Sequence, residues 1–383
     1  MEVKRPGIIW KIKRPAYGLY DAGRNWFLAV EKTLTDLGCT KVTGDDALFM
    51  YHNESGLQGL ACIHVDDFSL AGNAVFKEKI LNKLLEKFTF GKVEEHTFRF
   101  TGLDIKEKEG TIVIDQDQYC NSLEEMKIVD NKEKERELTK EEYMKFRGIT
   151  GKLNWLQECT RPDLSFDSLT MSMKTKRATL PDVNKLNKII RKAKASKSTI
   201  QFRKINSDHE KLYILSYGDA SYRTIDEKTR SIEGRVLFLT DGVRASPLLW
   251  KSRKISQVCH SSKEAETRSI DKTTDDSIFM ARMLKEIFTG KKSMNQIPVV
   301  IMTDSNPLKE SLYSTKQVER KTIRHVVQSM KDSLARKEVD RYEWVDTHGM
   351  VADLLTKDSA NPDLFMEVLE SGRLPTLNRG GED

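Results

Sequence analysis

The sequence predicts an α/β (α+β) protein with two or three domains, and three observations support this prediction. The chain has 383 residues, and one domain usually takes about 100–200 residues. Strand-like and helix-like apolar patterns alternate in residues 1–135 and again in residues 208–362. Between these two blocks, residues 136–207 show helical spacing alone. The chain therefore divides into three blocks, followed by a C-terminal tail at residues 363–383.

The composition is that of a folded protein with a strongly charged surface. Hydrophobic residues make up 38% and charged residues 32%, which excludes a disordered chain. The net charge of +6 is compatible with a nucleic-acid partner but does not require one. The five cysteines lack metal-clamp spacing, and no signal segment or bilayer-length apolar run is present. We expect reduced thiols, no membrane association, and an intracellular location in the cytoplasm or nucleus.

The first block, residues 1–135, combines strands and helices. Its expected strands are residues 8–12, 47–52, 57–65, 68–71, 97–106 and 111–115. Its expected helices are residues 21–37, which Gly38 terminates, and residues 74–88. Two of the strands form a hairpin with Asp66 and Asp67 at the turn. Aspartate is common in turns, so the pair alone does not decide between an ordinary turn and a metal site.

The second block, residues 136–207, is expected to be helical. Apolar residues within 143–156 recur in steps of three and four, which predicts one helix, and a later helix covers residues 182–197. The basic residues on the polar faces of this later helix include Lys188, Arg191 and Lys192. They form either an ordinary solvated surface or a surface that follows a phosphate backbone.

The third block, residues 208–362, is expected to contain five strands and a long helix over residues 263–288. The strands are residues 211–217, 234–240, 247–251, 298–303 and 341–345. Four carboxylates stand at the ends of its elements. Asp219 follows the first strand and Asp304 ends the fourth. Glu266 lies in the first turn of the long helix, and Asp353 opens the last helix.

This arrangement suits metal-dependent phosphodiester chemistry. Mg²⁺ prefers oxygen ligands, and two such ions about 4 Å apart can activate a water and stabilise a leaving oxygen. Strand ends and helix starts are rigid mounts for the carboxylates that hold the ions. Acidic residues also cap helices without any metal, so one of the four would be unremarkable. All four in this order favour a metal site.

Five short segments surround these carboxylates. They are residues 218–221 (Gly-Asp-Ala-Ser), 247–254 (Pro-Leu-Leu-Trp-Lys-Ser-Arg-Lys), 261–266 (Ser-Ser-Lys-Glu-Ala-Glu), 303–308 (Thr-Asp-Ser-Asn-Pro-Leu) and 352–357 (Ala-Asp-Leu-Leu-Thr-Lys). As a set they resemble the ribonuclease H of copia-type LTR retrotransposons. The resemblance implies a ribonuclease H-like α/β domain with a mixed five-stranded sheet. It also implies a site for two Mg²⁺ ions, with Mn²⁺ as a substitute.

The resemblance assigns metal ligands residue by residue. They would be Asp219, Glu266, Asp304 and Asp353. Glu266 is preferred to Glu264 because the small residue Ser269 follows it by three positions, but Glu264 stays an alternative. The role of His348, five residues before Asp353, stays open.

Six segments of the first two blocks resemble the reverse transcriptase of the same elements. They are residues 10–19 (Trp-Lys-Ile-Lys-Arg-Pro-Ala-Tyr-Gly-Leu), 24–26 (Arg-Asn-Trp), 63–68 (Ile-His-Val-Asp-Asp-Phe), 100–105 (Phe-Thr-Gly-Leu-Asp-Ile), 148–156 (Gly-Ile-Thr-Gly-Lys-Leu-Asn-Trp-Leu) and 160–164 (Thr-Arg-Pro-Asp-Leu). The resemblance implies a partial palm in residues 1–135 and a helical thumb and connection in residues 136–207. Asp66 and Asp67 would be a vestigial Mg²⁺ site. The fingers and the third aspartate of a palm have no counterpart, so we expect no polymerase activity from this chain alone.

The leading functional hypothesis is cleavage of RNA in RNA–DNA hybrids, with the hybrid recognised by shape, sugars and phosphates. Upstream Pol segments would be partners if the chain is part of a longer polyprotein. One alternative is a non-catalytic nucleic-acid-binding or scaffold protein derived from such an element. Two others are a decaying genomic remnant and another ribonuclease H-like enzyme, such as a transposase or integrase.

Overall fold

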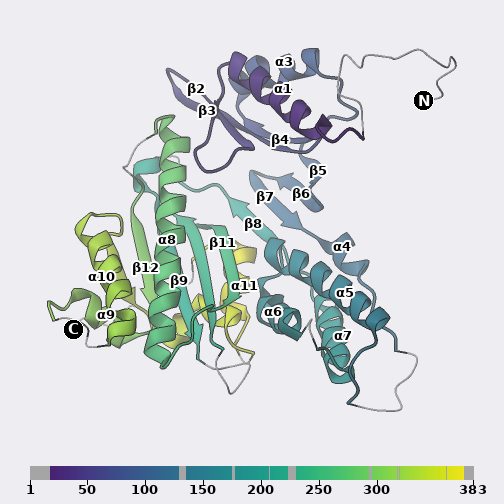
Figure 1. Cartoon of the computed structure of the whole chain (residues 1–383). Helices are drawn as coiled ribbons and strands as arrows, with labels where there is room; N and C mark the ends of the chain where they lie inside the picture. The colour runs from purple at the N-terminus through teal and green to yellow at the C-terminus, as the bar shows by residue number, and fades with distance from the viewer. Residues whose placement is uncertain are drawn as a thin grey trace. The chain divides into compact units, whose positions relative to one another are not determined.

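The computed structural model describes residues 18–128, 135–174, 177–206, 208–222, 230–292, 296–316, 318, 320–358 and 360–374 (Figure 1). The strand expected at residues 8–12, most of the segment 10–19, and residues 375–383 lie outside the described residues. The chain forms two compact units. One comprises Met1–Val93 with Glu286–Lys292, and the other comprises Glu94–Lys285 with Ser293–Asp383. None of the described helices is long and apolar enough to span a membrane.

The first unit is a small antiparallel sheet covered by helices. Its strands, in sheet order, are β1 (Thr40–Lys41), β2 (Leu48–Asn53), β3 (Gly56–His64) and β4 (Asp67–Gly72). Its helical segments are α1 (Ala22–Asp36), α2 (Ala74–Phe76), the π-helical turn η1 (Lys77–Leu81) and α3 (Asn82–Lys87). Apolar side chains spaced one turn apart, such as Val30 with Leu34 and Ile80 with Leu84, are buried against the sheet. The elements expected here are confirmed.

A second antiparallel sheet is formed by strands from the end of the predicted first block and one strand from the second block. Its strands, in order, are β5 (Thr97–Phe100), β6 (Leu103–Lys108), β7 (Thr111–Asp115) and β8 (Ile200–Arg203). The single strand expected at residues 97–106 is two strands, because Thr101 and Gly102 turn the chain with φ angles of 49° and 83°. Since β8 pairs with β7, the sheet joins residues that the expected boundary at 135 separates. The compact units instead divide after Val93.

Four helices follow or flank this sheet. They are α4 (Asp117–Asn121), α5 (Lys140–Cys159), α6 (Ser165–Lys174) and α7 (Leu180–Ala195). Their apolar faces form one core, which includes Phe146, Leu153, Leu186 and Ile190. A capping box fixes the start of α5, where the Thr139 hydroxyl accepts from Glu142 N and the Glu142 carboxylate accepts from Thr139 N. The helices expected for this block are confirmed, but the expectation that it is helical throughout is wrong, because β8 lies within it.

The third block is a mixed five-stranded sheet with the order β11-β10-β9-β12-β13. The strands are β9 (Tyr213–Ser221), β10 (Ile232–Thr240), β11 (Ala245–Lys254), β12 (Val299–Thr303) and β13 (Arg341–Trp344). The first three pair antiparallel, whereas β12 is parallel to both β9 and β13. The helices are α8 (Ser262–Thr289), α9 (Asn306–Tyr313), α10 (Lys321–Ala335) and α11 (Asp363–Ser371). This topology confirms the expected ribonuclease H-like fold.

Helix α11 corrects the expected tail. Residues 363–383 were assigned to a tail, but Asp363–Ser371 forms a helix whose Phe365, Val368 and Leu369 are buried in the core of the third block. The Phe365 ring meets the Phe238 ring edge to face, with centroids 5.9 Å apart. The spacing of the three apolar residues is that of one helical face. The domain therefore extends to at least residue 371.

Replacing Phe365 with alanine tests this assignment. The substitution removes a buried ring from the sheet core and is expected to lower the free energy of unfolding by about 3–5 kcal/mol. Glu367→Ala, at an exposed position of the same helix, is the matched control and should change it by less than about 0.5 kcal/mol. Denaturant unfolding measures both. Equal, small effects would show that α11 is not part of the domain.

Candidate functional site

Three of the predicted carboxylates lie close together near the C-terminal ends of the neighbouring strands β9 and β12. Oxygens of Asp219, Asp304 and Asp353 all lie within 4.8 Å of one another. Tyr217 of β9 pairs with Met302 of β12, and the two strands are parallel. Asp219 and Asp304 each stand two residues beyond this pair, so the strand register brings them side by side. The structure thus brings together three carboxylates that are far apart in the sequence.

Two expected positions need correction. Asp219 lies within β9, which continues to Ser221, rather than after the strand. The reason is that β10 pairs with β9 along its whole length, with Gly234 opposite Asp219. Asp353 lies within the short 3-10 helix η5 (Val351–Leu355), and the last α-helix begins ten residues later at Asp363.

Glu264 and Glu266 differ in the hydrogen bonds that their carboxylates accept. Glu264 is fully buried, and its carboxylate accepts from Arg268 at 3.0 Å and from His260 N at 3.1 Å. Burial opposes its ionisation, but these hydrogen bonds outweigh burial and hold the pKa of Glu264 below its ordinary value. Both carboxylate oxygens of Glu264 therefore already accept a hydrogen bond. Glu266 Oε2, in contrast, is buried and has no donor among the described residues.

We call the four carboxylates Asp219, Glu266, Asp304 and Asp353 the acidic site. Burial and mutual repulsion are the main electrostatic effects on these groups. Burial, followed by the charges of Asp219 and Asp304, raises the pKa of Glu266 well above its ordinary value. Burial and the charge of Asp219 also raise the pKa of Asp304. The same two causes raise the pKa of Asp353 to about 6. Glu266 is not one of the three carboxylates that meet within 4.8 Å, but the charges of Asp219 and Asp304 act on it.

Thr356 and Lys357 complete the acidic site, although the sequence analysis assigned them no role. The Thr356 hydroxyl donates to Asp219 Oδ2. Lys357 Nζ lies 2.7 Å from Asp353 Oδ1 and 3.6 Å from Asp219 Oδ2. Both residues were visible in the segment 352–357, and the only signal for their role was their place after Asp353.

A glycine allows η5 to approach the sheet. A Cβ on Gly234 would lie 2.7 Å from Thr356 Cγ2, 2.8 Å from Leu355 Cβ and 3.0 Å from Ala352 O. Only a residue without a side chain fits there, so Gly234 sets the position of Asp353 relative to Asp219. Ser269 plays a similar part on α8, where its hydroxyl donates to Asp219 O at 2.7 Å. Sequence reasoning found Ser269 but not Gly234.

The acidic site fits a divalent cation. Asp219 is only 1% exposed, yet its Oδ1 has no hydrogen-bond donor among the described residues. A buried carboxylate oxygen without a donor is costly unless a cation binds it. Carboxylate oxygens are also the ligands that Mg²⁺ and Mn²⁺ prefer. Asp219, Asp304, Asp353 and Glu266 are the residues that would hold the metal.

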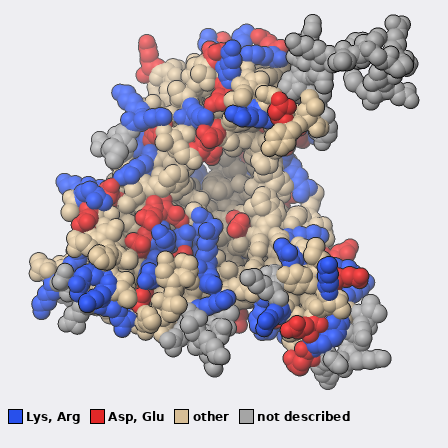
Figure 2. All heavy atoms as spheres, viewed as in Figure 1, with Lys and Arg blue, Asp and Glu red and all other residues tan. Residues whose placement is uncertain are grey.

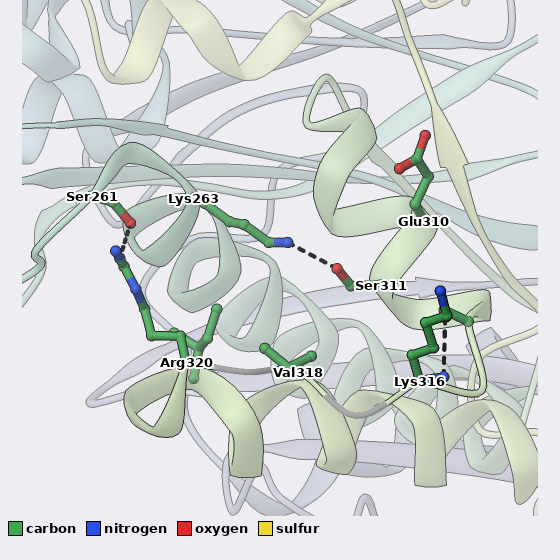
Figure 3. Close-up of a pocket in the computed structure, with 9 residues that line it drawn as sticks. Ser261, Lys263, Glu310, Ser311, Lys316, Val318 and Arg320 are labelled. Atoms are coloured by element: carbon green, nitrogen blue, oxygen red, sulfur yellow. Dashed lines mark hydrogen bonds between the residues drawn. The ribbon is translucent and has the colours of Figure 1, made fainter.

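A basic pocket lies beside the start of α8 (Figure 3). It has a volume of about 560 Å³, and its charged lining residues are Lys263, Lys316, Arg320 and Glu310. Lys263 Nζ donates to the Ser311 hydroxyl at 2.9 Å, and Arg320 donates to the Ser261 hydroxyl. In the space-filling view, lysine and arginine side chains gather over α9 and α10 (Figure 2). The pocket has a net positive charge and could accept an anion.

Asp66 and Asp67 lie on an exposed turn. Val65, with a φ of 53°, and Asp66 connect β3 to β4, and Asp67 is the first residue of β4. The Trp26 indole donates to Val65 O at 2.9 Å and so holds the turn. Within the part of the chain that the structure describes, neither aspartate belongs to a group of three potential metal ligands.

The three predicted phosphate-binding residues of α7 differ in their contacts. Lys192 Nζ donates to Asp163 O at 3.0 Å and to Asp167 Oδ2 at 3.1 Å. Arg191 Nε lies 3.6 Å from Glu125 Oε2. Lys188 is exposed. Lys192 and Arg191 thus lie near carboxylates while Lys188 is exposed, and phosphate binding by these three residues stays a prediction.

His348 is exposed in the 3-10 turn Thr347–Gly349, where its backbone N–H donates to Asp346 Oδ1 at 2.9 Å. Its ring is not among the groups that meet at the acidic site. Its role stays open.

Comparison with known proteins gives matches along nearly the whole chain. Residues 2–139 match the family model described as reverse transcriptase (RNA-dependent DNA polymerase). The chain is 25% identical over 374 residues to the retrovirus-related Pol polyprotein from transposon RE2 of Arabidopsis thaliana, with 92% of this chain and 24% of that protein covered. The polyprotein from transposon RE1 of the same plant is 25% identical over 375 residues, with the same coverage. The chain thus spans about a quarter of the length of these relatives.

Among solved structures, the chain is similar to the N-terminal ribonuclease H domain of a Mycobacterium tuberculosis protein, solved as a fusion with maltose-binding protein. The sequence identity is 16% and the TM-score is 0.30, with 42% of this chain and 97% of that chain covered. The reverse transcriptase match and the two plant relatives confirm the resemblance first suggested by the short segments. The chain is therefore similar to the Pol polyproteins from transposons RE1 and RE2 over most of its length, and its residues 2–139 match the reverse transcriptase family model.

Proposed function

We propose that the ribonuclease H-like domain is a metal-dependent nuclease that cuts the RNA strand of RNA–DNA hybrids. The observation that carries this proposal is the convergence of Asp219, Asp304 and Asp353 within 4.8 Å, with a buried oxygen of Asp219 left without a donor. A reverse transcriptase copies RNA into DNA, so its product is an RNA–DNA hybrid. The relationship to Pol polyproteins therefore favours this substrate over other nucleic acids.

The residues of the acidic site have distinct parts in this proposal. When bound, two divalent ions would activate a water and stabilise the leaving oxygen of the phosphodiester. Asp219 lies in β9, and Asp304 directly follows the neighbouring strand β12, so the pairing of these strands positions both carboxylates. Glu266 comes from α8 and Asp353 from η5, so the residues that would hold the ions come from different elements of the domain. Thr356 donates to Asp219 Oδ2 and thereby leaves Oδ1 for the metal.

The basic pocket supports nucleic acid as the substrate. Lys263 is three residues before Glu266 on α8, so the pocket and the acidic site share one rigid helix. A phosphate of the bound nucleic acid would pair with Lys263, Lys316 and Arg320. Such contacts fix the position of a duplex without reading its sequence. This agrees with recognition of the hybrid by shape, sugars and phosphates.

We also propose that the chain alone does not polymerise DNA. Asp66 and Asp67 are exposed on a hairpin turn, and no third carboxylate among the described residues joins them in a metal-ligating group. Two adjacent carboxylates are too few to hold two Mg²⁺ ions and a triphosphate. The alternative proposal, a non-catalytic nucleic-acid-binding or scaffold protein, predicts hybrid binding without cleavage.

Cleavage of a labelled RNA–DNA hybrid in Mg²⁺ tests the nuclease. Asp304→Asn and Glu266→Gln are each expected to lower the cleavage rate more than about 100-fold, the upper end of what an outer-shell partner costs. Hybrid binding by Asp304→Asn should be unchanged. Glu264→Gln is the matched control, because Arg268 and His260 N already occupy that carboxylate. It should lose stability and keep its rate within about threefold of wild type. A wild-type chain that binds the hybrid without cutting it would favour the scaffold alternative.

The pH dependence of stability tests the electrostatics of the acidic site. The pKa of Asp353 is about 6 in the folded chain, above its value in the unfolded chain. The folded state therefore binds more protons between pH 4 and 6, and stability falls as the pH rises through this window. In EDTA, Asp353→Asn removes this loss. The difference in Tm between Asp353→Asn and wild type should be more favourable to the variant at pH 7.5 than at pH 5.0.

Asp358→Asn, at an exposed neighbouring position, controls for the loss of one surface charge. Its Tm difference from wild type should not vary with pH. A pH-independent difference for Asp353→Asn as well would contradict the proposed charge repulsion.

Primer extension on an RNA template, with Mg²⁺ and all four deoxynucleotides, tests the absence of polymerase activity. No extension product is expected from the wild-type chain, because Asp66 and Asp67 lack a third ligand among the described residues. If a product forms, the comparison of wild type with Asp67→Asn shows whether the hairpin pair makes it. Extension that Asp67→Asn abolishes would overturn this proposal.

A further inference from the structure

Lys357 is the cation of the acidic site. Its Nζ lies 2.7 Å from Asp353 Oδ1 and 3.6 Å from Asp219 Oδ2. Within the described residues, no other lysine or arginine lies within 4.0 Å of either carboxylate. Four carboxylates and one ammonium give this small volume a formal charge of −3 when all are ionised. Glu264, outside the site, has two arginines near it, Arg268 at 3.0 Å and Arg320 at 4.0 Å.

The backbone holds Lys357 in this place. Its N–H donates to Asp353 O at 3.0 Å, so the chain turns back over η5 directly after the ligand. Thr356, fully buried, donates to Asp219 Oδ2 and fixes the preceding residue. The Lys357 side chain is 34% exposed, whereas that of Asp219 is 1% exposed. The ammonium therefore sits at the solvent-facing side of the acidic site, above its most buried carboxylate.

Resting on the proposed function, we propose that Lys357 is a positioning residue that acts as the resident counter-ion of the metal-free site and sets its affinity for divalent ions. In the metal-free chain the ammonium offsets the repulsion among the four carboxylates. A divalent ion that binds Asp353 and Asp219 must share these oxygens with the ammonium or displace it. Lys357 thus stabilises the empty site and weakens metal binding at the same time.

Metal affinity gives the first test. Binding of Mn²⁺ to the full chain is measured from the electron paramagnetic resonance signal of free Mn²⁺, and Asp304→Asn supplies the background from other acidic groups. Lys357→Met should bind Mn²⁺ about tenfold more tightly than wild type, because the competing charge is gone. Lys357→Arg keeps the charge and should bind like wild type within about threefold. Lys254→Met removes an exposed lysine elsewhere on the domain and should leave the Kd unchanged.

Unfolding in EDTA gives the second test, which needs no metal. At pH 7.5 Lys357→Met should have a lower Tm than wild type, and Mn²⁺ should raise its Tm by more than it raises that of wild type. Asp304→Asn/Lys357→Met is also compared with Asp304→Asn, and a Lys357→Met chain that unfolds completely without metal counts as the largest loss. The loss caused by Lys357→Met should be smaller in the Asp304→Asn chain than in wild type, since less negative charge remains to be offset.

The outcomes separate the two proposals. Unchanged or weaker Mn²⁺ binding by Lys357→Met, with the wild type binding normally, overturns the role of Lys357 and leaves the nuclease proposal intact. An equal loss of Tm in both backgrounds also overturns it, because Lys357 would then stabilise the chain by packing alone. A wild-type chain that binds no Mn²⁺ above the Asp304→Asn background overturns the metal site and the role of Lys357 together.

Discussion

Parallel pairing between β9 and β12 is the contact on which the acidic site depends. These strands are far apart in the sequence, and their hydrogen bonds place Asp219 and Asp304 at the same level of the sheet. The other residues of the acidic site are positioned against this pair. Helix α8 contacts β9 through Ser269, and η5 reaches the sheet at Gly234, where no side chain intervenes. A shift of one residue in the register would turn one of the two carboxylates to the opposite face.

The same arrangement has a cost in stability. Carboxylates that would be separated in the unfolded chain are brought together in a partly buried volume, where burial and, after it, mutual repulsion raise the pKa values of Glu266, Asp304 and Asp353. The core below them is well able to offset this cost, since β9 and β10 are buried along almost their whole length. The domain therefore combines a buried apolar sheet with a cluster of carboxylates whose pKa values are raised, a combination typical of catalytic sites.

Much of this site could be predicted from the sequence, because carboxylates next to strand and helix boundaries leave a local pattern. The sequence leaves Glu264 as an alternative to Glu266, and the hydrogen bond from Arg268 to Glu264, which is visible only in the structure, favours Glu266. Gly234 could not be predicted, because its requirement arises from η5, more than a hundred residues later in the chain. Strand β8 was missed for a similar reason. Strand β8 has only four residues, which is too short for a clear alternation of apolar and polar side chains, and its partner β7 lies in another block. Helix α11 did carry an apolar pattern, and it was missed because residues 363–383 were treated as a tail.

The late position of η5 and α11 in the chain has a consequence for synthesis. A ribosome delivers the first unit and all five strands of the mixed sheet before Asp353 and Phe365 emerge. Until then the sheet lacks the helix that covers part of its core, and the acidic site lacks both Asp353 and Lys357. The three aspartates can therefore converge only after η5 has been synthesised.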